Sequence, residues 1–160
     1  MGLMLVLHPY VAGYRPRDQA PCWEALHRVS EATGAVLLHV RCDHPMAYAD
    51  GLQRAVEASY VVVTCEQDIV PTPEQVHELV HCPWDYCAMD YELECGKLWS
   101  AGADHACLGL AKMTHSAWDH VKAKPRVPRV YWSDLAYEVS MRLGLWHLHA
   151  GPVEHRHRKL

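Results

Sequence analysis

The strongest constraint on the fold is an apolar run that is followed by the start of a helix. Residues 60–63, Tyr-Val-Val-Val, are uninterrupted and rich in β-branched side chains. Such a run predicts a strand buried on both faces, which is typical of α/β proteins. Thr72 and Pro73 follow shortly afterwards and supply an N-cap and a first-turn proline. A strand followed closely by a capped helix predicts a βα unit.

Two carboxylates, Glu66 and Asp68, lie between this strand and this helix. On extended backbone alternate side chains point the same way, so both are expected on one side of the strand end. Ligands of open α/β sheets bind at the carboxyl ends of strands, and paired carboxylates there suit a hard divalent cation that bridges to phosphates. The alternative is that the two side chains only solvate a loop.

Strand and helix patterns alternate along the rest of the chain. Strands are predicted at 3–7, 35–40, 60–63, 85–91 and 106–113, helices at 21–33, 48–58, 73–81, 115–122 and 133–143, and an extended tail at 145–160. This alternation predicts an α/β fold with a mostly parallel central sheet flanked by helices. At 160 residues the chain is expected to form a single domain.

Composition narrows the class of protein. The seven cysteines include no C-x-x-C pair, which favours free thiols and a cytoplasmic setting. Residues 1–7 are too short an apolar run for a signal peptide or a membrane span. No nucleic-acid module is visible, and the sequence leaves homo-oligomer formation open. Residues 121–160 hold 8 Lys/Arg against 3 Asp/Glu, on an otherwise acidic chain, which suits an anionic ligand or a solvated basic tail.

Several segments resemble GT-A glycosyltransferases of the family 2 type. Those enzymes run from a helix with Asn-x-Gly or Asn-Gly, through a buried strand, into an Asp-x-Asp motif and a proline. The similar segments here are 43–55, 60–71, 107–118, 132–144 and 147–155. The resemblance implies one GT-A-like domain over residues 1–160, with a nucleotide-binding half at 1–80 and a half that carries the acceptor and closes the metal site at 81–160.

The resemblance also implies an activity, which is transfer of a sugar from a nucleoside diphosphate donor to an unknown hydroxyl acceptor, with inversion. Mn²⁺ or Mg²⁺ would neutralise the leaving diphosphate. Asp68 matches the metal ligand, and Glu66 matches its partner facing ribose or metal. Asp43 matches the position that contacts the base, and Asp50 stands where asparagine is usual.

Two further positions follow from the resemblance. His8 and Tyr10 come after the first predicted strand, where the donor loop begins, although an ordinary surface loop is the alternative. Asp134 matches the general base that deprotonates the acceptor hydroxyl, a role that contributes roughly 10²–10⁴-fold to rate. The alternative for Asp134 is a helix N-cap.

Histidines are concentrated in the tail, where two H-x-H pairs occur. They are His147 with His149, and His155 with His157. On a strand each pair shares a face, so two imidazoles can bind one ion. By the resemblance, one tail histidine completes the metal site opposite Asp68, with His155 the better match and His147 the second. The alternative is a polar strand face.

Two other functions remain open from the sequence. A nucleotide-sugar-binding module without transfer activity is favoured by the short chain and by Ser133, which replaces the usual glutamate before Asp134. A histidine-rich, zinc-bound structural protein would use the tail histidines with cysteines such as Cys82 and Cys87. The cysteine spacings fit no standard zinc motif.

Overall fold

The computed structural model describes residues 4–11, 16–44, 46–92, 97–98, 107–122, 132–144 and 146–156, of which 16–19, 122 and 132–134 are described by backbone alone. The strands are β1 (Met4–Tyr10), β2 (Val36–Arg41), β3 (Val61–Cys65), β4 (Ile69–Val70), β5 (Tyr86–Tyr91), β6 (Leu110–Thr114) and β7 (His147–His155). The helices are α1 (Pro16–Thr33), α2 (Ala47–Ala58), α3 (Pro73–His81), α4 (His115–Lys122) and α5 (Trp132–Leu143).

The strands form one seven-stranded sheet in the order β2-β1-β3-β6-β5-β7-β4. The strands β2, β1 and β3 run parallel, as do β5 and β7. Strand β6 is antiparallel to both of its neighbours, and β4 is antiparallel to β7. The predicted single-domain α/β fold is confirmed. The sheet is mixed, because β6 reverses direction between the two parallel parts, and alternation of elements along a chain does not determine strand direction.

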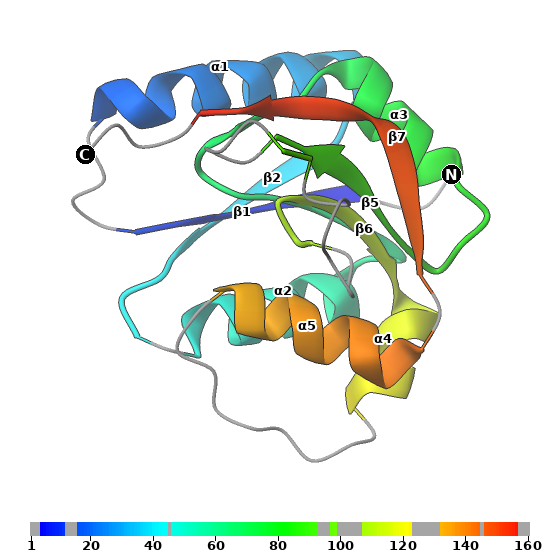
Figure 1. Ribbon diagram of the computed structural model, residues 1–160. Coiled ribbons are helices and arrows are strands. Elements are labelled where there is room, and N and C mark those ends of the chain that lie inside the picture. The colour runs from blue at the N-terminus through cyan, green and yellow to red at the C-terminus, as the bar shows by residue number, and fades with distance from the viewer. Residues whose placement is uncertain are drawn as a thin grey trace.

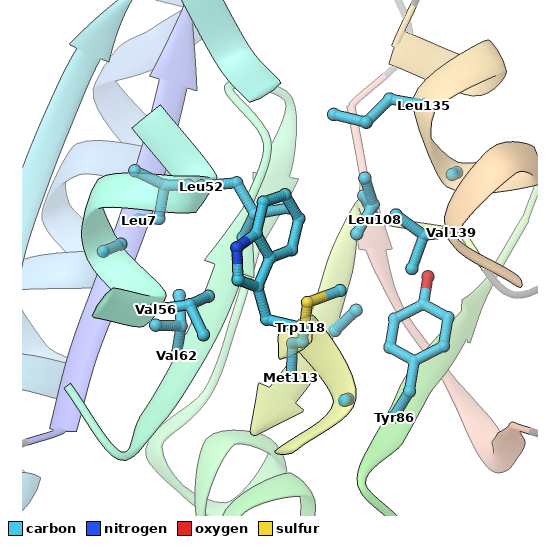
Figure 2. Close-up of a cluster of buried hydrophobic side chains, with 14 of the residues drawn as sticks. Leu7, Leu52, Val56, Val62, Tyr86, Leu108, Met113, Trp118, Leu135 and Val139 are labelled. Carbon is cyan, nitrogen blue, oxygen red and sulfur yellow. The ribbon is translucent and has the colours of Figure 1, made fainter. Parts of the chain in front are cut away.

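Helices cover both faces of the sheet. In Figure 1, α1 and α3 lie along one face, while α2, α4 and α5 lie along the other. Each face has its own core. Figure 2 shows the core beneath α2, α4 and α5, where Trp118 lies between Leu52 on one side and Val139 on the other. The core under α1 and α3 includes Leu26 and Leu79. With a core on each face, the central strands are buried on both sides.

Local sequence signals explain several element boundaries. Thr72 and Gln75 form a capping box at the start of α3, with Gln75 N donating to Thr72 Oγ1 at 3.3 Å and Thr72 N donating to Gln75 Oε1 at 3.0 Å. Gly34 closes α1 with φ +70°. Helix α1 begins at Pro16, so the predicted start at Pro21 is wrong: this proline lies inside the helix, where it removes one backbone hydrogen bond.

One glycine is required by packing. A Cβ on Gly51, in α2, would lie 2.9 Å from Val40 Cγ2 at the end of β2. Only glycine therefore lets α2 approach this strand so closely. No helix in the described part of the chain is long and apolar enough to cross a membrane.

Candidate functional site

The chain turns sharply after β3, and the turn carries both predicted carboxylates. Ile69 N donates to the carbonyl of Glu66 at 3.1 Å, which closes a turn over residues 66–69, and Glu66 N donates to the carbonyl of Gly109 at 2.8 Å. The expectation that Glu66 and Asp68 alternate along extended backbone is therefore wrong. Gln67, between them, is 8% exposed, and its Oε1 accepts a hydrogen bond from Val11 N at 2.8 Å. This bond ties the turn to the end of β1.

Asp68 meets the final strand of the chain. Its Oδ2 lies 3.2 Å from His155 Nε2. Two backbone features bring these side chains together: Ile69 of β4 is the ladder partner of His155, and Arg156 N donates to the carbonyl of Asp68 at 2.8 Å. The Asp68 and His155 side chains are 25% and 15% exposed, so the pair is partly open to solvent.

A hydrogen bond to a backbone carbonyl fixes a proton on one nitrogen of the His155 ring. Its Nδ1 lies 3.2 Å from the carbonyl oxygen of Glu92. A carbonyl can only accept, so Nδ1 carries the proton and donates it. Nε2 faces the Asp68 carboxylate, so it donates a proton to that carboxylate or, once an ion displaces the proton, offers its lone pair to the ion. Backbone carbonyls orient metal-binding histidines in the same way.

Glu66 is half-buried in the same turn as Asp68. Burial raises its pKa to about 8, and the negative charge of Asp68 adds to the shift. A cation placed between the two carboxylates would remove the repulsion and favour the ionised form of Glu66. The turn therefore provides a site where a cation can replace a proton.

The ends of β1 and β2 lie along the same edge of the sheet as Glu66. The carbonyl of Tyr10, at the end of β1, accepts a hydrogen bond from Cys42 N at 2.8 Å. Burial raises the pKa of the Cys42 thiol to about 11, and the charge of Glu66 adds to the shift. Asp43 is exposed, with its Oδ2 3.9 Å from Arg41 Nε.

Asp50 lies in the first turn of α2 and is exposed. It lines a groove with Arg41 and His44, beside the end of β2. Asp43 thus lies just past the carboxyl end of β2, and Asp50 lines the groove beside it. The carboxyl ends of strands are where ligands bind in open α/β sheets.

His8 is placed differently from its prediction. Strand β1 extends to Tyr10, so His8 lies within the strand and has no exposed surface, and the surface-loop alternative is wrong for this residue. Its Nδ1 donates to the carbonyl of Cys65 at 2.9 Å and lies 3.8 Å from Cys22 Sγ. With no surface exposed, the His8 side chain touches no ligand in this conformation.

Two other predicted residues lie away from the Asp68–His155 pair or are only partly described. His147 is at the opposite end of β7 from His155, beside Cys87 of β5, so it cannot reach Asp68 and its assignment as an alternative ligand is wrong. Asp134 is the third residue of α5, in the first helical turn rather than before it. Its side chain lies outside the described residues, and its role as general base stays a prediction.

Two contributors were not singled out from the sequence. Gln67 anchors the carboxylate turn, and the carbonyl of Glu92 sets the tautomer of His155. Gln67 did carry a signal, because it is an amide between two acidic residues. A backbone carbonyl leaves no signature in a sequence.

The fold is a GT-A-like nucleotide-diphospho-sugar transferase fold. Among solved structures, the chain is similar to the catalytic domain of Drosophila β1,4-galactosyltransferase 7 in complex with xylobiose, with TM-score 0.64, 13% identity, and coverage of 98% of this chain and 71% of that one. It is also similar to a glycosyltransferase involved in glycosylation of the major capsid of PBCV-1, with TM-score 0.57, 14% identity, and coverage of 92% and 81%.

A third similar structure is 4-diphosphocytidyl-2C-methyl-D-erythritol synthase from Anaerococcus prevotii, with TM-score 0.60, 8% identity, and coverage of 99% of this chain and 93% of that one. No known protein family and no curated protein matches the sequence. At such low identities the likeness concerns the fold alone.

Proposed function

We propose that this protein is a metal-dependent glycosyltransferase that moves a sugar from a nucleoside diphosphate to a hydroxyl acceptor. The observation that carries the proposal is the approach of His155 Nε2 to Asp68 Oδ2 at 3.2 Å. The pair joins the turn after β3 to the last strand, at the edge of the sheet where a donor would bind. Two of the similar structures are glycosyltransferases, which supports the choice of reaction.

The proposed ion is held by Asp68 and His155, with Glu66 as a further carboxylate. An imidazole ligand favours Mn²⁺ over Mg²⁺, because Mg²⁺ prefers an all-oxygen, largely hydrated shell. When bound, the ion neutralises the charge that develops on the leaving diphosphate. The chain's own part is to hold Asp68 through Arg156 N, and to direct the His155 lone pair through Glu92.

The donor nucleoside is proposed to lie along the ends of β1 and β2. Tyr10 and the exposed Asp43 are the proposed contacts to the base or ribose there. The His8 side chain is buried within β1, next to that edge. Asp50, on the rim of the neighbouring groove, is a second candidate for a ribose contact.

Asp134 is proposed as the general base for an inverting displacement. It would accept the proton of the acceptor hydroxyl as that oxygen attacks the anomeric carbon, while the diphosphate leaves from the opposite face. This assignment rests on the resemblance of the α5 segment to the Glu-Asp motif helix.

The proposal is tested by binding and by product formation. Melting temperature is measured with a panel of nucleotide sugars and nucleoside diphosphates, each with Mn²⁺ and with EDTA. One donor should raise the melting temperature only with Mn²⁺, and the effect should disappear in Asp68→Asn and in His155→Ala. Glu154→Gln, an exposed neighbour on β7 whose partner is Arg156, is the matched control. Binding that is indifferent to Mn²⁺ would contradict the proposal.

A nucleotide-sugar-binding module without transfer activity is the second candidate, favoured by Ser133 in place of the motif glutamate. Hydrolysis of the identified donor distinguishes the enzyme from the binding module. It is measured as the release of nucleoside diphosphate with and without Mn²⁺. An enzyme of this type slowly transfers the sugar to water and releases the nucleoside diphosphate, whereas a binding module retains intact donor.

A further inference from the structure

A second cluster of metal-binding side chains lies away from the Asp68–His155 pair. Cys82 follows the end of α3, Cys87 lies in β5, and His149 lies in β7. The two sulfur atoms and one imidazole nitrogen of His149 all lie within 4.8 Å of one another. Three neighbouring elements therefore direct two thiols and one imidazole to a common point.

The imidazole of His149 is oriented as in a metal site. Its Nδ1 lies 2.7 Å from Glu78 Oε1, and a carboxylate accepts, so Nδ1 carries the proton. Its Nε2 is buried and has no hydrogen-bond partner within the described part of the chain. A buried lone pair without a partner is unfavourable, and a cation would satisfy it. A carboxylate that holds the far nitrogen of a ligating histidine is a common arrangement around zinc.

The types of ligand atom in the cluster favour zinc among the divalent cations. Two thiols and one imidazole are the ligands that zinc prefers, whereas Mn²⁺ and Mg²⁺ prefer oxygen. Cys87 has no exposed surface and Cys82 is 9% exposed, so the ligands are protected from solvent. The fourth position of a tetrahedral zinc is open to water or to His147, whose ring centre lies 4.7 Å from that of His149.

A buried lysine lies beside the cluster. Lys112 is 2% exposed and is the ladder partner of Cys87 on the neighbouring strand. Its Nζ donates to the carbonyl of Cys82 at 2.6 Å. This hydrogen bond holds the backbone of Cys82 close to the strand that carries Lys112.

We propose that Cys82, Cys87 and His149 bind one structural Zn²⁺ ion, with Glu78 orienting His149. On binding, each thiol loses its proton to solvent and forms a sulfur–zinc bond, while His149 Nε2 donates its lone pair without losing a proton. The ion links α3, β5 and β7. Since β7 also carries His155, zinc would fix the strand that closes the carboxylate turn. The proposal does not depend on glycosyl transfer.

The other sulfur-rich cluster fits a metal less well. Cys22 Sγ lies 4.0 Å from Cys65 Sγ and 3.8 Å from His8 Nδ1. That nitrogen already donates its proton to the carbonyl of Cys65, so it has no lone pair for an ion. This cluster serves as the internal comparison in the experiment.

The test uses the full chain, stripped of metal under reducing conditions and titrated with Co²⁺ and then Zn²⁺. We expect about one equivalent of Co²⁺ with a thiolate-to-metal charge-transfer band, displaced by Zn²⁺. Cys87→Ser and His149→Ala should lose the band, whereas Cys22→Ser and Cys107→Ser should keep it. Glu78→Gln should bind Zn²⁺ about 10- to 100-fold more weakly.

A measurement on the unsubstituted protein covers the case in which a variant fails to fold. Zn²⁺ should protect Cys82 and Cys87 from alkylation, as mapped by mass spectrometry of peptides, and should raise the melting temperature relative to protein with chelator. No charge-transfer band in the unsubstituted protein, a disulfide between Cys82 and Cys87 after purification under reducing conditions, or a band lost only in Cys22→Ser would overturn the proposal.

Discussion

Asp68 and His155 meet across the last strand pair of the sheet, with Oδ2 and Nε2 3.2 Å apart. Both side chains are positioned by contacts with residues far away in the sequence. The β4–β7 ladder and the hydrogen bond from Arg156 N to the Asp68 carbonyl set the separation, and the Glu92 carbonyl sets the tautomer. The pair therefore depends on contacts between segments that lie far apart in the sequence.

Asp68→Asn should abolish Mn²⁺-dependent nucleotide binding. The amide keeps the shape of the side chain but removes the negative charge that an ion requires. Calorimetric titration of the preferred nucleoside diphosphate, with and without Mn²⁺, measures the effect. Glu154→Gln should bind as the unsubstituted protein does. Unchanged Mn²⁺ dependence in a folded Asp68→Asn protein would show that the ion binds elsewhere.

Asp134→Asn should lower the transfer rate at least ~10²-fold, because an amide cannot accept the acceptor proton. The cost in stability should stay below about 1 kcal/mol, since a carboxylate in the first helical turn contributes only that much through the helix dipole. Steady-state rates and thermal melts measure the two effects, with Ser133→Ala as the neighbouring control. Retained activity in the folded variant would assign Asp134 a structural role only.

Acid should destabilise the protein through His39. Burial, together with the charges of His8 and His27, lowers the pKa of His39 to about 4. Between about pH 4 and 6.5 the unfolded chain binds a proton that the folded chain does not, so folding stability is lost as pH falls through this range.

His39→Phe keeps a ring against Trp23, whose ring centre lies 4.0 Å from that of His39, and removes the titrating group. The drop in melting temperature from pH 7 to pH 5 should be smaller than in the unsubstituted protein by at least ~2 °C. His120→Gln, at an exposed position on α4, should leave the drop unchanged. An equal drop in His39→Phe would contradict the assignment.

Gly51→Ala should destabilise the fold, although alanine is the better helix former by about 1 kcal/mol. The added Cβ would lie 2.9 Å from Val40 Cγ2, and overpacking of this kind costs about 1–3 kcal/mol. Chemical denaturation of Gly51→Ala, Val40→Ala and the double variant measures the coupling. The double variant should be more stable than the sum of the single effects, and strict additivity would rule out the steric explanation.

Elements with local signals were predicted well. Helices α3 and α4 occupy the predicted residues 73–81 and 115–122, and the α3 start is confirmed because Thr72, Pro73 and Gln75 act within one turn. The two-residue strand β4 was not predicted, since it exists only through pairing with β7. The same dependence on partners explains why the direction of β6 could not be predicted.

The functional site likewise combines features with a local sequence signal and features that depend on distant partners. The carboxylates after β3 and the selection of His155 over His147 as partner of Asp68 came from sequence pattern and resemblance, and the geometry brings Asp68 and His155 together. The predictions that proved wrong were those that depended on the burial of a side chain or on the distance between two residues. His8 is buried because β1 extends past it, and His147 is remote because β7 is extended between the two histidines.

The sequence by itself determined what acts within a few residues: the buried strands, the capped helices, the acidic pair after β3 and the extended histidine-rich tail. The tertiary structure alone decided which distant groups meet. It paired His155 with Asp68, placed Gln67 against Val11, and gathered Cys82, Cys87 and His149 around one point. Strand order and register determine these contacts. Both result from packing of the whole sheet between its helices, because no local pattern specifies them.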